Sequence, residues 1–198
     1  MSSNRIPPKQ ITGLYGAIVK MFAQRMFGLV PKAFGVLWHN LPVLKAQMGF
    51  SQKLHQWRAC DESLKSYAHI AVASLVGCSF CLDLNYFMAR NKGLDLDKAQ
   101  QVPQWRQSNA FNLLEQEVLE YAEAMSQTPP RVTDEMVASL RAQLGDSALI
   151  ELTSIIGFAQ MTTRTNTALG IEAEGFSAAC GLKPKGLPSA QLGVVSAS

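Results

Sequence analysis

The sequence predicts an all-helical protein. Apolar residues recur three and four positions apart along most of the chain, and no persistent period-two alternation indicates a β-strand. Glycine and proline fall between the periodic segments, where helices are expected to end. Of the 198 residues, 47% are apolar and 17% are charged, which excludes a disordered or fibrous chain and favours a substantial buried core.

The N-terminal third contains two apolar segments. The first, Ile11 to Val30, has one apolar helical face and is expected to end or kink at Pro31. The second, Ala33 to Leu44, is broken by Pro42. A basic amphipathic segment of this kind either lies on a membrane or, more commonly, packs against a core or a second subunit. We favour the second interpretation.

The rest of the chain up to Leu169 contains the remaining helices. Asp61 or Ser63 is a suitable N-cap for one helix and Thr133 for another, while the pair of prolines at 129–130 is a firm break. The expected helices span residues 61–76, 78–91, 95–101, 113–125, 133–145 and 147–169. We therefore expect an N-terminal helical segment (1–60) that packs on a helical core (61–177), followed by a flexible tail (178–198).

Charge is distributed unevenly. Residues 1–59 hold eight Lys or Arg and no acidic residue, whereas the remainder holds ten basic and fifteen acidic residues. A basic region can meet a nucleic acid, an anionic membrane or an acidic partner. Because the bases are dispersed and no nucleic-acid motif accompanies them, we expect this region to pack against the acidic remainder of its own chain or of a second subunit.

Composition also bears on location and assembly. No uninterrupted apolar run reaches the roughly 18 residues of a membrane-spanning helix, and residues 1–10 do not resemble a signal peptide. We expect a cytoplasmic protein without a membrane or nucleic-acid partner. The low charge leaves apolar surface to cover, which favours a homo-oligomer.

Cys78 and Cys81 form a Cys-x-x-Cys motif at the start of an expected helix. The helix dipole and unpaired backbone N–H groups stabilise a thiolate there, and a second cysteine one turn on can attack a disulfide or sulfenic acid on the first. A redox dithiol is the favoured interpretation, and a buried pair without function is the alternative. Zinc is disfavoured because the sequence supplies no second ligand pair. Cys60 and Cys180 are isolated and are expected to be bystanders.

Several segments in the stretch 61–176 follow one another in the order typical of one protein family. They are residues 69–81, 89–93, 96–102, 114–125, 129–133, 151–153 and 164–170. On these segments the chain resembles the carboxymuconolactone decarboxylase/alkylhydroperoxidase D-like (AhpD-like) family. The resemblance implies an all-helical AhpD-like fold that assembles as trimers or hexamers and, in the redox branch, a peroxidase centre.

The family's peroxidase centre has a Glu twelve residues before the first cysteine and a His four after the second. Here these positions are Ser66 and Asn85, so the proton relay that the resemblance implies is missing. His69, three residues after Ser66, is a candidate substitute relay because its unperturbed pKa is near neutrality. By the resemblance Cys81 attacks and Cys78 resolves, whereas the helix dipole favours Cys78 as the attacking thiol.

Three further polar residues are candidates for supporting roles. Glu151 lies in an apolar stretch that opens the last helix. Three roles are open to it: a base with a raised pKa, a partner of Arg164, or a helix cap. The structural roles are favoured for Glu151. Asp83 and Tyr86 lie near the cysteines but off the Cys81 face.

The predicted function is reduction of a small hydroperoxide through a Cys78–Cys81 dithiol/disulfide cycle. The electrons come from an unidentified dithiol donor, and no cofactor or metal is expected. Two alternatives stay open: a carboxymuconolactone decarboxylase-like lyase, which would not need the cysteine pair, and a non-enzymatic helical oligomer with a vestigial site.

Overall fold

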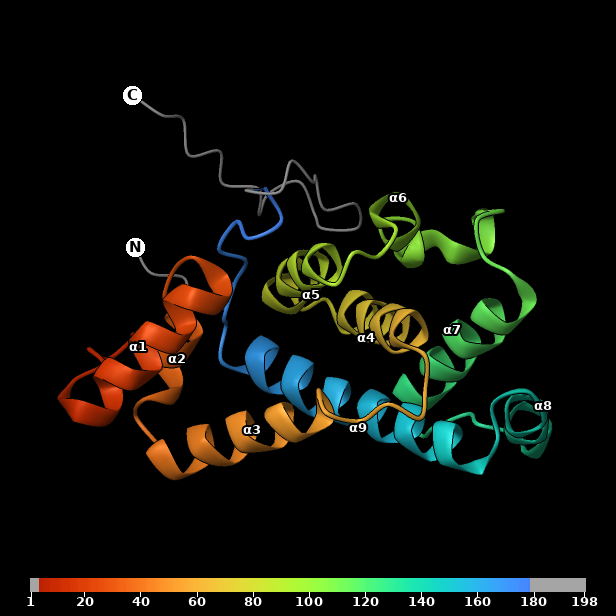
Figure 1. Cartoon of the computed structure of the whole chain (residues 1–198), viewed down its shortest axis with the longest axis horizontal. Coiled ribbons are helices and arrows are strands. Elements are labelled where there is room, and N and C mark those ends of the chain that lie inside the picture. Colours follow the sequence, from red (N-terminus) through yellow and green to blue (C-terminus); the bar gives the residue numbers. More distant parts are fainter. Residues whose placement is uncertain (1–3, 179–198) are drawn as a thin grey trace.

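The computed structural model describes residues 4–178, and within that range every regular element is a helix (Figure 1). This confirms the all-helical class. The expected tail, 178–198, lies outside the described residues except for its first position. The elements in chain order are α1 (Gly13–Phe27), α2 (Lys32–Leu37), α3 (Leu41–Leu54), α4 (Glu62–Val76), α5 (Ser79–Asn91), α6 (Leu96–Ala99), the 3-10 helix η1 (Val102–Gln107), α7 (Leu113–Ser126), α8 (Asp134–Leu144) and α9 (Asp146–Ala168).

The second N-terminal segment differs from expectation. Pro42 does not break a helix but lies in the first turn of α3, where the missing N–H would have no helical acceptor. Asn40 caps that turn by accepting a hydrogen bond from the Val43 N–H at 3.3 Å. As a result residues 33–44 form α2 and the start of α3, and α3 continues to Leu54.

The first helix also ends earlier than expected. Gly28, with φ of 76°, ends α1 in the left-handed conformation that glycine adopts readily, and its N–H donates to the Gln24 carbonyl. Pro31 therefore precedes α2 instead of closing α1. A small apolar cluster of Val19, Trp38 and Leu44 joins the three N-terminal helices.

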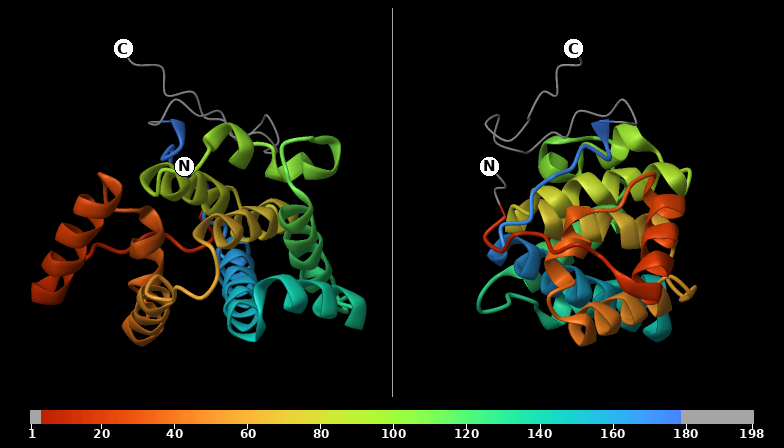
Figure 2. Two further views of the ribbon diagram at one scale, coloured as in Figure 1. Left: turned by 45° about the vertical axis from the view of Figure 1, so that its right-hand side comes forward. Right: turned by 90° about the vertical axis from the view of Figure 1, so that its left-hand side faces the viewer.

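The core is built around α4. This helix packs on α5, α7 and α9, and its Ile70 and Val72 are completely buried. The rotated views show α4 and α5 on one side of α9, with α3 running beside α9 (Figure 2). The contact between α3 and α9 includes Phe50 and Phe158, whose ring centres are 5.3 Å apart.

The segment after α9, residues 171–177, packs against α5. The buried Asp83 carboxylate accepts hydrogen bonds from the backbone N–H groups of residues 174–177 and from the Ser177 hydroxyl, at 2.5 to 3.0 Å. Glu174 accepts the Lys32 N–H at the start of α2, at 2.7 Å. The Phe176 ring packs against the rings of Phe27, Phe80 and Phe87. This segment therefore connects the N-terminal helices to α5.

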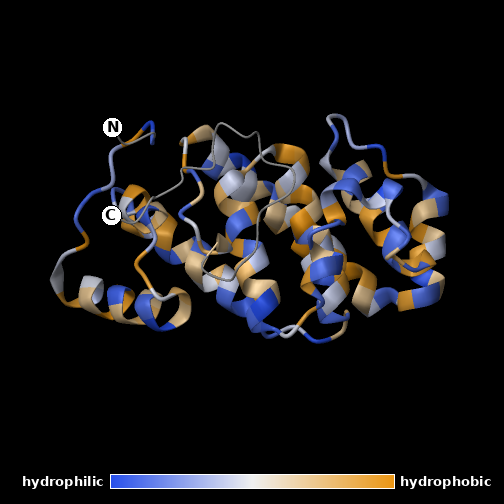
Figure 3. Ribbon diagram, turned by 90° about the horizontal axis from the view of Figure 1, so that it is seen from above, coloured by the Kyte–Doolittle hydropathy of each residue, from blue (hydrophilic) through white to orange (hydrophobic). Residues whose placement is uncertain are grey.

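One face of α1 is apolar but exposed. Apolar and polar residues alternate along the helices at helical spacing (Figure 3). In α1, however, Leu14, Ile18 and Met21 are 84%, 52% and 67% exposed, on the side opposite buried Val19 and Ala23. Contiguous exposed apolar side chains of this kind are typical of protein–protein contacts. Within residues 4–178, no helix combines the length and hydropathy needed to cross a membrane.

Among residues 4–178, the basic side chains of the N-terminal region form no ion pair. Across the described residues, no Lys or Arg of positions 4–59 lies within ion-pair distance of a carboxylate. Within residues 4–178, the contacts of this region with the rest of the chain are therefore not ion pairs. Pairing with a second subunit, and the trimer or hexamer that the resemblance implies, stay predictions.

We expect the chain to form a homo-oligomer that depends on α1. Leu14→Asp combined with Met21→Asp places two charges on the exposed apolar face, so light scattering coupled to size exclusion should show a smaller species. Gln24→Asp, which adds a charge on the polar edge of the same helix, is the matched control. An unchanged mass for the double variant would contradict this role of α1.

Candidate functional site

Cys78 and Cys81 form a disulfide at the start of α5, with their Cα atoms 5.3 Å apart. Gly77, with φ of 73°, ends α4 in the left-handed conformation and turns the chain directly into α5. Cys78 then takes the N-cap position, where its sulfur accepts a hydrogen bond from the Cys81 N–H at 3.2 Å. The cysteine spacing thus places both sulfurs at the positive end of a helix.

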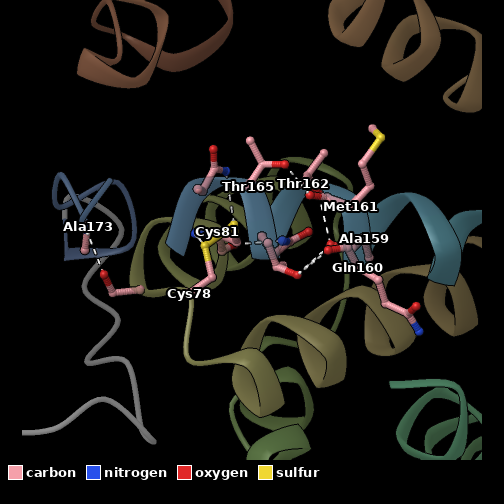
Figure 4. The surroundings of a disulfide bond; sticks show 12 residues. Cys78, Cys81, Ala159, Gln160, Met161, Thr162, Thr165 and Ala173 are labelled. Atoms are coloured by element: carbon pink, nitrogen blue, oxygen red, sulfur yellow. Dashed lines mark hydrogen bonds between the residues drawn. A yellow bond between two sulfur atoms is a disulfide. The ribbon is translucent and has the colours of Figure 1, made fainter. Parts of the chain in front are cut away.

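The disulfide is enclosed by other elements. Cys78 and Cys81 are 1% and 5% exposed, and Figure 4 shows their sulfurs beside α9. The side chain of Asn166 in α9 donates from Nδ2 to the Cys81 sulfur at 3.3 Å. On the other side, the Ser79 hydroxyl accepts the Ala173 N–H at 3.1 Å, which holds the C-terminal segment against the start of α5.

Asn166 has no role that the sequence predicts. It belongs to the 164–170 segment and lies 85 residues from Cys81 in the chain. No spacing rule connects such positions, because only the packing of α9 against α5 brings them together. Asn166 is therefore the polar contact of the cysteine pair that sequence reasoning missed.

Ser66 and Asn85, which stand at the positions of the family's Glu and His, form no hydrogen bond with the cysteine sulfurs in the described structure. Ser66 lies on the buried face of α4. The Asn85 side chain donates to the Cys81 backbone carbonyl at 2.7 Å, one turn back along α5. Among the described residues, neither Ser66 nor Asn85 forms a hydrogen bond with a cysteine sulfur.

His69 has an apolar environment. The ring is partly buried in α4 and packs edge-on against Phe158, with the ring centres 6.5 Å apart. Burial, aided by the positive charge of Lys92, lowers the pKa of His69 to about 4. Within the described structure the ring forms no hydrogen bond with either cysteine. A base this weak takes a proton from a thiol only at a large free-energy cost, so the relay role stays a prediction.

Glu151 is half of a buried ion pair. Its Oε1 accepts from Lys65 Nζ at 2.8 Å, and its Oε2 accepts the Ala59 N–H at 2.8 Å. Of the structural roles expected for Glu151, the pairing with Arg164 is not the one formed, because Arg164 donates to the Ser126 carbonyl.

Lys65 completes this cluster. Although burial opposes it, the hydrogen bonds from Lys65 to Glu151 and Glu62 raise the pKa of Lys65. Its ammonium group also donates to the Trp57 carbonyl at 3.0 Å, so all of its close polar neighbours are acceptors.

Cys60 differs from the disulfide pair. It is buried and free, and burial together with the Glu151 charge raises the pKa of its thiol to about 11. Cys60 is therefore protonated at neutral pH and a weak nucleophile. Cys180 lies outside the described residues. Within residues 4–178, no group of three or more His, Cys, Asp or Glu side chains is placed to hold a metal ion.

Part of the chain is similar in sequence to known proteins. The model of the carboxymuconolactone decarboxylase family matches residues 42–124, so the match begins in α3, before the expected core boundary at 61. The uncharacterized protein YnjA of Escherichia coli is 37% identical over 115 residues, which is 58% of this chain and 63% of YnjA. The chain thus matches less than two thirds of that relative's length.

Solved structures with low sequence identity confirm the AhpD-like fold. The debrominase Bmp8 has a TM-score of 0.76 at 20% identity, over 88% of this chain and 94% of its own. Bmp8 has also been solved in complex with 2,3,4-tribromopyrrole. The AhpD core of a peroxidase-related protein from Ralstonia eutropha has a TM-score of 0.74 at 16% identity, over 86% of this chain and 94% of its own.

The low pKa of His69 predicts how stability depends on pH. Between the unperturbed value of 6.5 and the folded value of about 4, the unfolded chain binds a proton at His69 that the folded chain does not. Stability from this group is complete above pH 6.5 and is lost as pH falls through that window. Urea unfolding of His69→Asn should show a smaller loss than the parent protein. A His69 NMR titration midpoint near 6.5 would contradict the assignment.

The buried ion pair predicts a strong effect on folding. Lys65→Met leaves the Glu151 carboxylate buried without its cation, and we expect urea denaturation to show a loss of about 3–5 kcal/mol in unfolding free energy. Lys65→Met with Glu151→Leu should recover much of this loss, because an apolar pair can replace a buried ion pair. A single variant as stable as the parent would show that the pair contributes nothing to stability.

Proposed function

We propose that the chain is a thiol-dependent oxidoreductase that reduces a small hydroperoxide, because it has an AhpD-like fold and the model of the carboxymuconolactone decarboxylase family matches its residues 42–124. The observation that carries the proposal is the Cys78–Cys81 disulfide at a helix N-terminus. Each sulfur accepts one N–H hydrogen bond, and these donors favour a thiolate once the disulfide is reduced.

The proposed cycle has three balanced steps. One thiolate attacks the O–O bond of the hydroperoxide and becomes a sulfenic acid, while the leaving alkoxide takes a proton and departs as an alcohol. The second thiol attacks the sulfenic sulfur, forming the disulfide and releasing water. A dithiol donor then reduces Cys78–Cys81 by two thiol–disulfide exchanges and is itself oxidised to a disulfide.

Burial restricts the substrate and the rate. Both sulfurs are almost fully enclosed by α9 and the C-terminal segment, so a small hydroperoxide fits better than a protein disulfide. Without Glu and His at positions 66 and 85, the thiolate forms by equilibrium ionisation instead of by a relay. We therefore expect a slower peroxidase than one with the complete family centre.

The debrominase neighbour supports one alternative substrate class. Bmp8 shares the fold at 20% identity and binds 2,3,4-tribromopyrrole in a solved complex. Brominated pyrroles therefore belong among the compounds tested. The lyase and the non-enzymatic oligomer differ from the peroxidase in what they predict for the cysteines, because neither needs a reactive cysteine pair.

We expect the reduced protein to lose two thiols rapidly on addition of a small excess of cumene hydroperoxide, with a peptide map that shows Cys78 joined to Cys81. Intact mass measures the loss of two hydrogens. Cys78→Ser and Cys81→Ser each block the disulfide, and the variant that keeps the attacking thiol accumulates a sulfenic acid. Cys60→Ser is the matched control and should react like the parent.

Other outcomes distinguish the alternatives. If the Cys78 and Cys81 thiols react no faster with the hydroperoxide than free cysteine does, the peroxidase proposal is wrong. Lactone decarboxylation that survives Cys78→Ser with Cys81→Ser would favour a lyase. Release of bromide from 2,3,4-tribromopyrrole would instead favour a debrominase.

A further inference from the structure

The contact between Asn166 and Cys81 joins α9 to the start of α5. Asn166 lies near the end of α9, is partly buried, and its Nδ2 is 3.3 Å from the Cys81 sulfur. The Cys78 sulfur has a different donor, the Cys81 backbone N–H at 3.2 Å. Each sulfur therefore has its own hydrogen-bond donor, one from the backbone of α5 and one from a side chain of α9.

Asn85 shows that an amide near Cys81 does not by itself reach the sulfur. It lies one turn further along α5, and its Nδ2 donates to the Cys81 carbonyl at 2.7 Å. Two asparagines thus contact the same cysteine, and only Asn166 touches the atom that changes its redox state. This pair provides a matched comparison within one protein.

We propose that Asn166 is a hydrogen-bond donor that stabilises the Cys81 thiolate in the reduced protein and selects Cys81 as the attacking thiol. The stabilisation needs only the geometry, whereas the attack rests on the proposed peroxidase function. Cys81 is the more exposed residue of the pair, at 5% against 1% for Cys78. Cys78 is suited to the other role, because its sulfur accepts the Cys81 N–H, and a thiolate stabilised in this way is a good leaving group when an external dithiol attacks Cys81.

The size of the effect follows from the nature of the bond. A hydrogen bond to a charged group stabilises it enough to move a pKa by about one unit or more. Replacing Asn166 should therefore raise the Cys81 pKa by about one unit, and the thiolate fraction should fall about tenfold at pH values below the pKa of the parent thiol. The more basic thiolate is also a better nucleophile, so the net fall in reaction rate with peroxide should be about threefold.

The test uses single-thiol readouts that need no peroxide. In the Cys78→Ser background, the rate of iodoacetamide alkylation at Cys81 is followed by peptide mass from pH 5 to 10, with and without Asn166→Leu. We expect Asn166→Leu to raise the pH midpoint of Cys81 alkylation by about one unit. Asn85→Leu in the same background should leave the pH midpoint of Cys81 alkylation nearly unchanged. Asn166→Asp loses the donor and adds a negative charge beside the sulfur, so it should raise that midpoint by more than Asn166→Leu does.

The Cys81→Ser background separates this role from a structural one. There, Asn166→Leu should not move the Cys78 midpoint, because the Cys78 donor is a backbone N–H. Equal shifts at both cysteines, or no shift at Cys81, would overturn the proposal whether or not the protein reduces peroxide. A selective Cys81 shift in a protein that ignores peroxide would support the Asn166 donor while refuting the peroxidase function.

Discussion

The buried carboxylate of Asp83 is the interaction on which the arrangement of the site depends. Four backbone N–H groups and one hydroxyl converge on it, so a charge that is 1% exposed is fully compensated by donors from residues 174–177. Those residues are thereby held against α5, close to the disulfide. Asp83 is thus a fold-determining residue and not an active-site neighbour of the cysteines.

The same segment connects the N-terminal helices to the site. Glu174 caps the start of α2, and Phe176 fills the space between Phe27 and α5. Burial raises the pKa of Glu174, so this cap weakens when the carboxyl becomes protonated in acid. The N-terminal helices therefore contact the core near the disulfide through this segment, and also through Phe50 of α3 against Phe158 of α9.

The features that could be predicted from the sequence are local. The helix start at Cys78 depends on residues only a few positions apart, so the sequence pattern predicts it. The prediction that Pro42 breaks a helix is wrong, because proline is compatible with both the end and the first turn of a helix. Only the Asn40 cap shows that Pro42 lies in a first turn. Lys65 with Glu151 and Cys81 with Asn166 are 86 and 85 residues apart, and single-sequence periodicity carries no information on such pairs.

The surroundings of the cysteines also constrain the chemistry. A proton relay speeds thiol oxidation by taking the proton as the sulfur attacks, and this centre has donors to sulfur in place of an acceptor for the proton. Donors lower the pKa of a thiol but also lower its intrinsic nucleophilicity, so their benefit is limited to pH values below that pKa. The rate of the proposed peroxide reduction should therefore rise with pH as the thiolate fraction grows, and it should level off once the thiol is fully ionised. A centre built in this way responds to pH through one thiol, whereas a relay adds the titration of its own acid and base.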